Sequence, residues 1–146
     1  MSNIYTHPSG GKLFQVGAQE IPNVVKHNDI HLIIYAAKEY QPFTSNPTIT
    51  KVFIPLDDTS KLSPQEIITT LKLTDEASTI ATNYLKAGKN VISSCQAGLN
   101  RSGITSAFTL KKCTNASKEE IIKHIRKTRH PHALSNTLFV KLFLTS

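Results

Sequence analysis

Apolar and polar residues follow one another in blocks that predict strands separated by helices. Lys12–Gly17 alternates and then stops at a glycine, which predicts a short strand. His31–Ala36 is a continuous apolar run, typical of a strand that is buried on both faces. Ile49–Leu56 and Asn90–Ser94 are two further β-rich runs, and Gln41–Pro47, which holds two prolines, predicts a loop.

Two capping boxes mark the starts of two helices. Ser63–Glu66 reads S-P-Q-E, with proline at the first helical position, and predicts a helix that extends to about Leu85. Thr74–Asp75 is a candidate break that would divide this helix into two pieces. Ser117–Glu120 reads S-K-E-E and opens a basic amphipathic helix, which Pro131 ends.

Two more helices complete the pattern, one from Gly103 to about Cys113 and one around Leu138–Phe143. Strands separated by helices favour a parallel sheet that is covered on both faces. The sequence therefore predicts an α/β fold with a central, mostly parallel sheet of four or five strands flanked by helices. The 146 residues fit one domain, residues 1–146, which is long enough to bury a core without disulfides or a structural metal.

The composition excludes several classes of protein. Hydrophobic residues make up 39% and charged residues 18%, which argues against a disordered chain. No stretch approaches the ~20 apolar residues of a membrane span, and residues 1–11 have no apolar signal core. The two cysteines, Cys95 and Cys113, are too few for a disulfide scaffold or a zinc site. We therefore expect a cytoplasmic protein without a metal or another cofactor, and no membrane partner.

The charge is strongly basic and uneven. Seventeen Lys and Arg residues against ten Asp and Glu residues give a net charge of +7, which favours anionic partners. The segment Lys111–His132 carries much of this excess but no aromatic residue that could stack on bases. We interpret it as a solvated helix face, including Arg129, and do not favour a nucleic-acid partner.

The segment Val91–Gly103, VISSCQAGLNRSG, holds the candidate site. A predicted buried strand leads to Cys95, five residues follow, and Arg101 precedes a helix. Open sheets of this class bind ligands beyond the carboxyl ends of their strands. Backbone N–H groups at a helix start can hold an anion, and the same positive field favours a thiolate, the nucleophilic form of cysteine. Arg101 can bind two phosphate oxygens at once, which lysine cannot do.

Two other residues of this segment strengthen the functional interpretation of Cys95. Gly98 allows a close backbone approach or a positive φ, and Ser102 offers a hydroxyl directed back at the cysteine sulfur. The alternative is that Cys95 is only a small buried hydrophobe. The presence of Gly98, Ser102 and the preceding strand favours the interpretation of Cys95 as a nucleophile.

The segment SCQAGLNRSG resembles the signature loop of cysteine-dependent protein phosphatases, C-x-x-G-x-x-R-S, and is closest to that of the small dual-specificity phosphatases. The resemblance extends to the flanking sequence. Leu13–Tyr40 is similar to the opening of that family, IPLDD lies where the family carries its general acid, and Ile125–Leu144 is similar to its closing segment. The similarity thus covers roughly Leu13 to Leu144.

The resemblance implies a two-step reaction on a phosphorylated protein, at phosphotyrosine with or without phosphoserine and phosphothreonine. Cys95 would attack phosphorus and form a phosphocysteine, Asp58 would act as general acid and then base, and Ser102 would assist release of the thiolate. The phosphate would be held by Arg101 and by the backbone N–H groups of Gln96, Ala97, Gly98, Leu99 and Asn100. Motif alignment favours Asp58 over Asp57, and the alternative is that both are turn residues.

Two positions depart from the family pattern. Ser94 stands where the family usually has histidine before the nucleophile, which predicts lower activity or a pH optimum shifted upward. Asn100 before Arg101 resembles the RNA 5′-triphosphatases of the same superfamily, although those usually have Thr where Ser102 stands and a histidine in the loop. An RNA 5′-triphosphatase and a catalytically weak phosphate-binding module therefore remain as alternatives.

Overall fold

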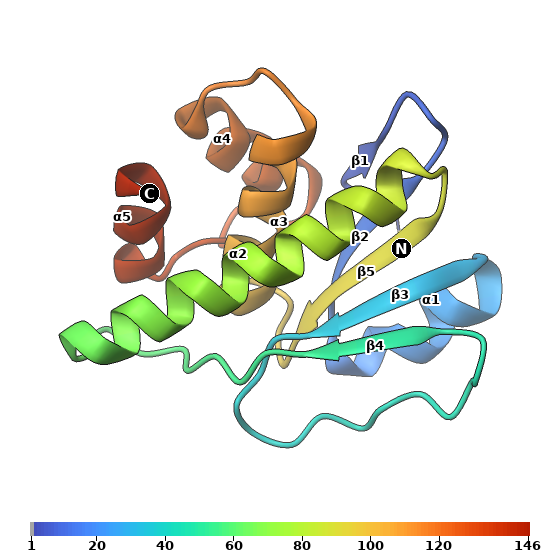
Figure 1. The fold of residues 1–146 in the computed structure, drawn as a ribbon, viewed down its shortest axis with the longest axis horizontal. Helices are drawn as coiled ribbons and strands as arrows, with labels where there is room; N and C mark the ends of the chain where they lie inside the picture. The colour runs from blue at the N-terminus through green and yellow to red at the C-terminus, as the bar shows by residue number, and fades with distance from the viewer. Residues whose placement is uncertain (1) are drawn as a thin grey trace.

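The computed structural model describes residues 2–146, and in this part of the chain a mixed sheet forms the centre of the fold (Figure 1). Its strand order is β1-β2-β5-β3-β4. The neighbours among β2, β5, β3 and β4 run parallel, whereas β1 pairs antiparallel with β2. The strands are β1 (Tyr5–Thr6), β2 (Lys12–Gly17), β3 (Ile30–Tyr35), β4 (Thr50–Phe53) and β5 (Asn90–Cys95).

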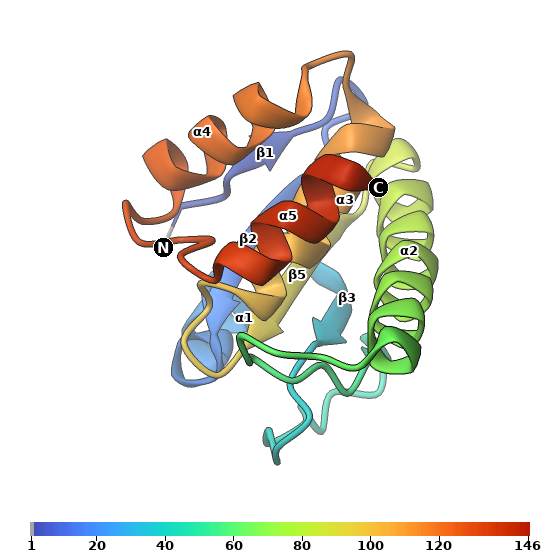
Figure 2. The ribbon, with the colours of Figure 1, turned by 90° about the vertical axis from the view of Figure 1, so that its left-hand side faces the viewer.

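Helices cover both faces of this sheet. A 3-10 turn at Ala18–Glu20 leads into the first helix, and the helices are α1 (Ile21–His27), α2 (Pro64–Lys86), α3 (Arg101–Cys113), α4 (Lys118–Thr128) and α5 (Thr137–Thr145). Helix α1 packs on one face, where its Ile21 and Val24 join a core with Phe14 and Ile33. Helices α2 to α5 cover the other face and form the larger core, as Figures 1 and 2 show. The predicted fold class is confirmed.

Two of the predicted elements differ from the structure. The helix α2 is continuous, so the predicted break at Thr74–Asp75 is wrong. Thr74 is fully buried in the core face of α2, and the Asp75 carbonyl oxygen accepts hydrogen bonds from Ser78 and Thr79. Packing of this face outweighs the low helix propensity of threonine and aspartate. The predicted strand Ile49–Leu56 contains only the short edge strand β4.

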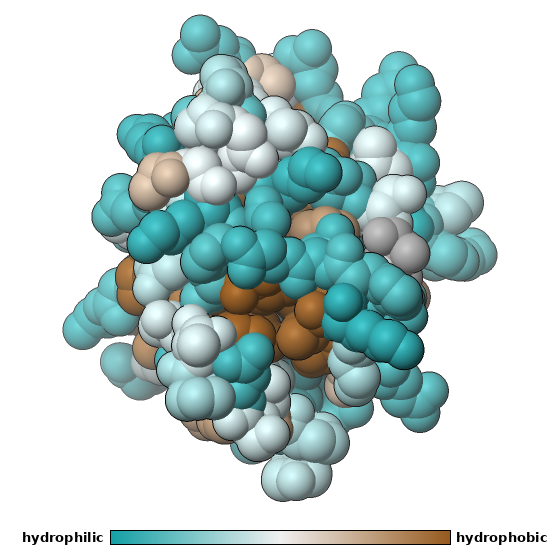
Figure 3. All heavy atoms as spheres, turned by 90° about the vertical axis from the view of Figure 1, so that its right-hand side faces the viewer, coloured by the Kyte–Doolittle hydropathy of each residue, from teal (hydrophilic) through white to brown (hydrophobic). Residues whose placement is uncertain are grey.

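The carboxyl ends of the parallel strands lie near the centre of Figure 1, at the left-hand end of the sheet, where the arrowheads point. The opposite face is covered mainly by hydrophilic side chains, with hydrophobic ones gathered in a recess near its centre (Figure 3). Among residues 2–146, no helix combines the length and apolar character that a membrane crossing needs.

Candidate active site

The loop between β5 and α3 lies at the middle of the carboxyl edge of the sheet. Cys95 is the last residue of β5 and Arg101 is the first residue of α3. Because β5 lies between β2 and β3, this loop is flanked by the ends of both strands. Figure 2 faces this edge and shows the loop close to the segment before α2, with α5 above it. The structure therefore places the predicted segment where open sheets bind ligands.

Gly98 lets the loop pack directly against the end of β2. Its φ is +73°, and a Cβ built there would lie 2.4 Å from both the Gly17 nitrogen and the Val16 carbonyl carbon. Real Cβ atoms essentially never approach other atoms that closely. Both the backbone conformation and the space thus require glycine at this position.

Cys95 and Ser102 face each other inside the loop. The Cys95 Sγ and the Ser102 Oγ are 3.3 Å apart, and both residues are buried. The Ser102 carbonyl oxygen also accepts a hydrogen bond of 3.0 Å from the Ser93 hydroxyl, which fixes the start of α3 against β5. A thiolate at Cys95 can accept a hydrogen bond from the Ser102 hydroxyl, so the geometry suits stabilisation of the charged sulfur.

The Arg101 guanidinium is buried and held by Glu39, a residue that the sequence did not single out. Both of its terminal nitrogens bind the Glu39 carboxylate, with 2.8 Å between Nη2 and Oε2, and Nη1 also donates to the Leu56 carbonyl oxygen at 3.2 Å. The buried Nε–H of Arg101 has no hydrogen-bond partner among the described residues. An unpaired buried donor costs free energy, so an acceptor bound there would be stabilised.

The charges around Arg101 depend on one another. The hydrogen bond from Arg101 lowers the pKa of the Glu39 carboxyl to about 2. Burial alone would lower the pKa of the Arg101 guanidinium, but the bond to Glu39 and the charges of Cys95 and Asp58 raise it above its ordinary value. Arg101 therefore stays cationic between Glu39 and the sulfur of Cys95.

Ser94 is joined to a buried glutamine. Its hydroxyl donates to the Ile34 carbonyl oxygen at 2.7 Å and accepts from Gln41 Nε2 at 3.3 Å. The Gln41 Oε1 accepts a hydrogen bond of 3.1 Å from the Ala37 backbone N–H. Both side chains are buried, so a neutral hydrogen-bonded network lies directly before Cys95.

Arg129 is not on a solvated face, and that prediction is wrong. Its side chain is 11% exposed. Its Nε donates to the Gly98 carbonyl oxygen at 3.0 Å, and its Nη2 donates to the Ala97 carbonyl oxygen at 3.1 Å and to Glu20 Oε1 at 2.9 Å. The same Glu20 oxygen accepts the Gly17 N–H at 2.7 Å. Arg129 thus binds two carbonyl oxygens of the loop, so that these peptide groups are held by their oxygen atoms and their N–H groups are not used by Arg129.

Asp58 is held by two asparagine side chains at the rim of the loop. Asn100 Nδ2 donates to Asp58 Oδ2 at 3.1 Å, and Asn136 Nδ2 donates to Oδ1 at 2.7 Å. The Asp57 side chain is exposed and makes no hydrogen bond among the described residues, while its carbonyl oxygen accepts from the Thr59 N–H. The structure therefore brings Asp58, and not Asp57, to Asn100 of the loop.

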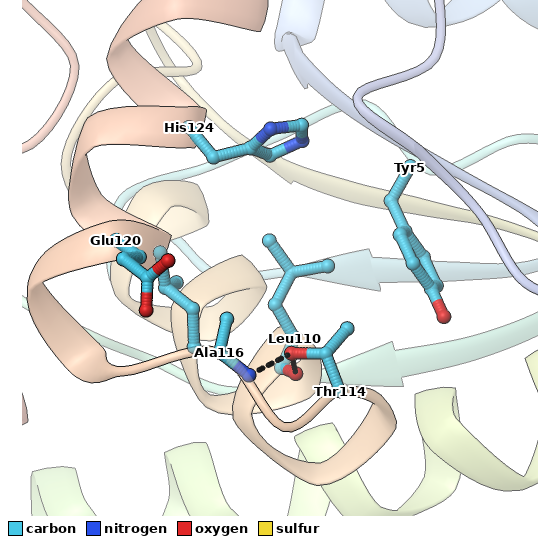
Figure 4. Close-up of a pocket in the computed structure, with 7 residues that line it drawn as sticks. Tyr5, Leu110, Thr114, Ala116, Glu120 and His124 are labelled. Carbon is cyan, nitrogen blue, oxygen red and sulfur yellow. Dashed lines mark hydrogen bonds between the residues drawn. The ribbon is translucent and has the colours of Figure 1, made fainter.

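Other chemistry-bearing residues lie away from the loop. Cys113 is at the far end of α3, where its half-buried Sγ is 3.8 Å from Thr82 Oγ1. A cavity of about 320 Å³ lies between β1, α3 and α4 and is lined by Tyr5, Glu120 and His124 among others. Figure 4 shows these lining side chains. The His124 Nε2 is 2.6 Å from the Ile4 carbonyl oxygen. No group of three or more metal-ligating side chains occurs in residues 2–146.

No family model matches the chain, and no curated protein matches it. Solved structures do resemble it over nearly its whole length. Human DUSP28 aligns with a TM-score of 0.76 at 14% identity, covering 99% of this chain and 96% of that chain. DUSP15 aligns with a TM-score of 0.69 at 22% identity, covering 97% and 85%. PTPMT1 in complex with PI(5)P aligns with a TM-score of 0.64 at 20% identity, covering 97% and 96%. The chain thus has the fold of the phosphatases that its sequence resembles.

Proposed function

We propose that the chain is a cysteine-dependent phosphatase that hydrolyses phosphate monoesters on proteins, at phosphotyrosine with or without phosphoserine and phosphothreonine. One observation carries the proposal. The Cys95 sulfur and the unpaired Arg101 Nε–H are buried at opposite ends of one loop that starts a helix. A nucleophile and a cationic donor at a helix start suit a phosphoryl group.

The chemistry would proceed in two steps. The Cys95 thiolate attacks phosphorus while the bond to the leaving oxygen breaks, and Asp58 donates its proton to that oxygen. Water then attacks the phosphocysteine and gives a proton to Asp58, the sulfur–phosphorus bond breaks, and the Ser102 hydroxyl stabilises the departing thiolate. Arg101 and the backbone N–H groups from Gln96 to Ser102 would hold the non-reacting oxygens in both steps.

The structure also supports the choice of a working enzyme over a binding module. Ser94 is satisfied by Gln41 and Ile34, so the replacement of histidine leaves no unpaired polar group behind the nucleophile. Among the structural neighbours, OH1 from the Orf virus is a tyrosine phosphatase, and PTPMT1 has been solved in complex with PI(5)P. We propose a phosphorylated protein as partner, and a reducing, cytoplasmic setting is supported by the two free thiols.

The test is hydrolysis of p-nitrophenyl phosphate in the presence of a chelator, across pH, by wild type, Cys95→Ser and the matched control Cys113→Ser. We expect Cys95→Ser to lower kcat roughly 10³-fold or more and Cys113→Ser to leave it unchanged. Turnover that survives in Cys95→Ser would refute the thiolate mechanism. A folded wild type that binds phosphate without turnover would support the binding module instead.

The RNA 5′-triphosphatase alternative is tested in the same assay format. Phosphate release from a triphosphate-ended RNA is compared with release from a phosphotyrosine peptide at equal concentration. We expect faster release from the peptide. Faster release from the RNA would favour the alternative.

A further inference from the structure

Two hollows adjoin the candidate site on the side of α1 and β4. The larger, about 770 Å³, lies between α1 and residues 42–45, and Gln96 is one of its lining residues. The smaller, about 470 Å³, lies between residues 38–43 and Phe53 and includes Glu39. Gln96 directly follows Cys95, and Glu39 binds Arg101. Each hollow is therefore lined by one residue that adjoins or contacts the candidate site.

Exposed aromatic side chains gather at these hollows. Six large hydrophobic side chains are exposed among residues 2–146, and three of them line the smaller hollow. They are Tyr40, Phe43 and Phe53, whose exposed fractions are 82%, 50% and 49%. Phe43 also lines the larger hollow. Because exposed apolar clusters on a monomer mark interaction sites, this clustering indicates a binding surface.

Stacking and hydrogen bonds hold the segment that carries Tyr40 and Phe43 in place. The Phe43 ring stacks on the fully buried Tyr35 ring, with 4.2 Å between centroids and 25° between planes. The Tyr35 hydroxyl accepts a hydrogen bond of 2.8 Å from the Thr44 N–H. Gln96 Nε2 donates to the Tyr40 carbonyl oxygen at 2.7 Å, which ties the segment to the loop. A surface that is already ordered loses little conformational entropy when a ligand binds.

The lining of the larger hollow combines apolar contact with hydrogen-bonding groups. Pro22, Val25, Pro42 and Phe43 supply the apolar contact, and Gln19, Thr44, Ser45 and Gln96 supply polar atoms. An extended polypeptide carries apolar side chains together with obligatory backbone donors and acceptors, so it can satisfy both kinds of group. An acyl chain would leave the polar groups unpaired.

We propose that the larger hollow is a groove that binds the polypeptide segment next to the phosphorylated residue of a protein substrate. An apolar side chain of that segment would pack between Phe43 and Val25. The inference rests on the proposed function and narrows its substrate class. The preferred substrates are phosphoproteins with apolar residues beside the phosphorylated residue, and purely polar flanking sequences are poor substrates.

The test compares two phosphotyrosine peptides that differ only in their flanking residues, leucine in one and serine in the other. For wild type we expect kcat/KM to be about tenfold higher for the leucine peptide. Phe43→Ser and Val25→Ser, on opposite walls of the groove, should each bring the two peptides close to equality. Ile68→Ser is the matched control, because Ile68 is an exposed apolar residue of α2 outside the groove and should keep the preference.

p-Nitrophenyl phosphate separates the two hypotheses, since it has no flanking chain. If wild type does not hydrolyse it, the proposed function fails, whereas wild type and the Ile68→Ser control are expected to hydrolyse it equally. Equal use of both peptides by wild type, or a preference that survives both groove variants, would overturn the groove proposal. The proposal would also be overturned if Phe43→Ser and Val25→Ser lost activity only on phosphoinositide in phosphatidylcholine vesicles, because the groove would then bind lipid.

Discussion

Gly98→Ala separates backbone conformation from steric clash, because the chain offers a second glycine as its control. Gly98 has φ +73° and backbone atoms 2.4 Å from the position of an added Cβ. Gly10 has φ +99°, and no heavy atom lies within 4 Å of its added Cβ. Alanine at either position is strained by the positive φ, but only at Gly98 would its Cβ also collide with the backbone at the end of β2.

The magnitudes follow from these two contributions. A positive φ costs about 1–2 kcal/mol for an alanine. Forced overpacking costs about 1–3 kcal/mol, with the upper end expected here because the colliding atoms of Gly17 and Val16 belong to the backbone and cannot rotate away. We therefore expect Gly98→Ala to lower the free energy of unfolding by about 4 kcal/mol and Gly10→Ala by about 1.5 kcal/mol.

Urea unfolding of wild type and both variants measures this difference at constant pH. The midpoint should fall much further for Gly98→Ala than for Gly10→Ala, with the slope m unchanged. Turnover by folded Gly98→Ala should also fall, because the displaced loop carries the phosphate-binding N–H groups. Equal losses of stability in the two variants would refute the argument that loop and β2 are in steric contact at this point.

Three further predictions concern the charged groups of the site. Asp58→Asn should lower kcat on a phosphotyrosine peptide by about 10²-fold or more, and Asp57→Asn should have little effect; the opposite ranking would identify Asp57 as the acid. The pKa of Glu39 is lowered to about 2 from its usual 4.5, so the ionised carboxylate stabilises the fold. This contribution is fully present above about pH 4.5 and disappears as the pH falls through about 2. The stability difference between wild type and Glu39→Gln in urea should therefore be largest near neutral pH and vanish near pH 2, and a difference that is constant with pH would contradict the pairing with Arg101. Arg129→Met should lower the free energy of unfolding by about 3 kcal/mol and should also lower kcat. Arg129→Lys should restore only part of the stability and part of kcat. Wild-type stability in both variants would show that the loop does not need the hydrogen bonds from Arg129.

The strands and the loop could be predicted because their signals are local. The β-branched pair Val91 and Ile92 within Asn90–Ser94 indicates a strand, and the spacing from Cys95 to Arg101 marks the loop without knowledge of any other element. The two capping boxes also predicted the starts of α2 and α4, where Ser63 and Ser117 accept hydrogen bonds from the backbone N–H groups. These features depend on neighbours within a few residues.

The side chains that support the loop could not be predicted, because they arrive from distant elements. Glu39 reaches Arg101 only because β3 pairs with β5 in the register that sets Tyr35 beside Ser94. Arg129 reaches Gly98 from the end of α4, and in the sequence it is one of several basic residues in a helix. A signal for Glu39 did exist. It is an acidic residue shortly after a buried strand, at the sheet edge where the candidate loop was expected.

The length of α3 has a consequence for how the protein would respond to peroxide. Cys95 precedes this helix and Cys113 ends it, and a helix of 13 residues is about 20 Å long. A disulfide needs Cα atoms within about 7 Å, so Cys113 cannot reach a sulfenic acid formed at Cys95 while the fold is intact. Protection of an oxidised Cys95 must come from a neighbouring backbone nitrogen or from a thiol outside these 146 residues, such as glutathione. Without that protection, oxidation to the sulfinic acid would remove the nucleophile permanently.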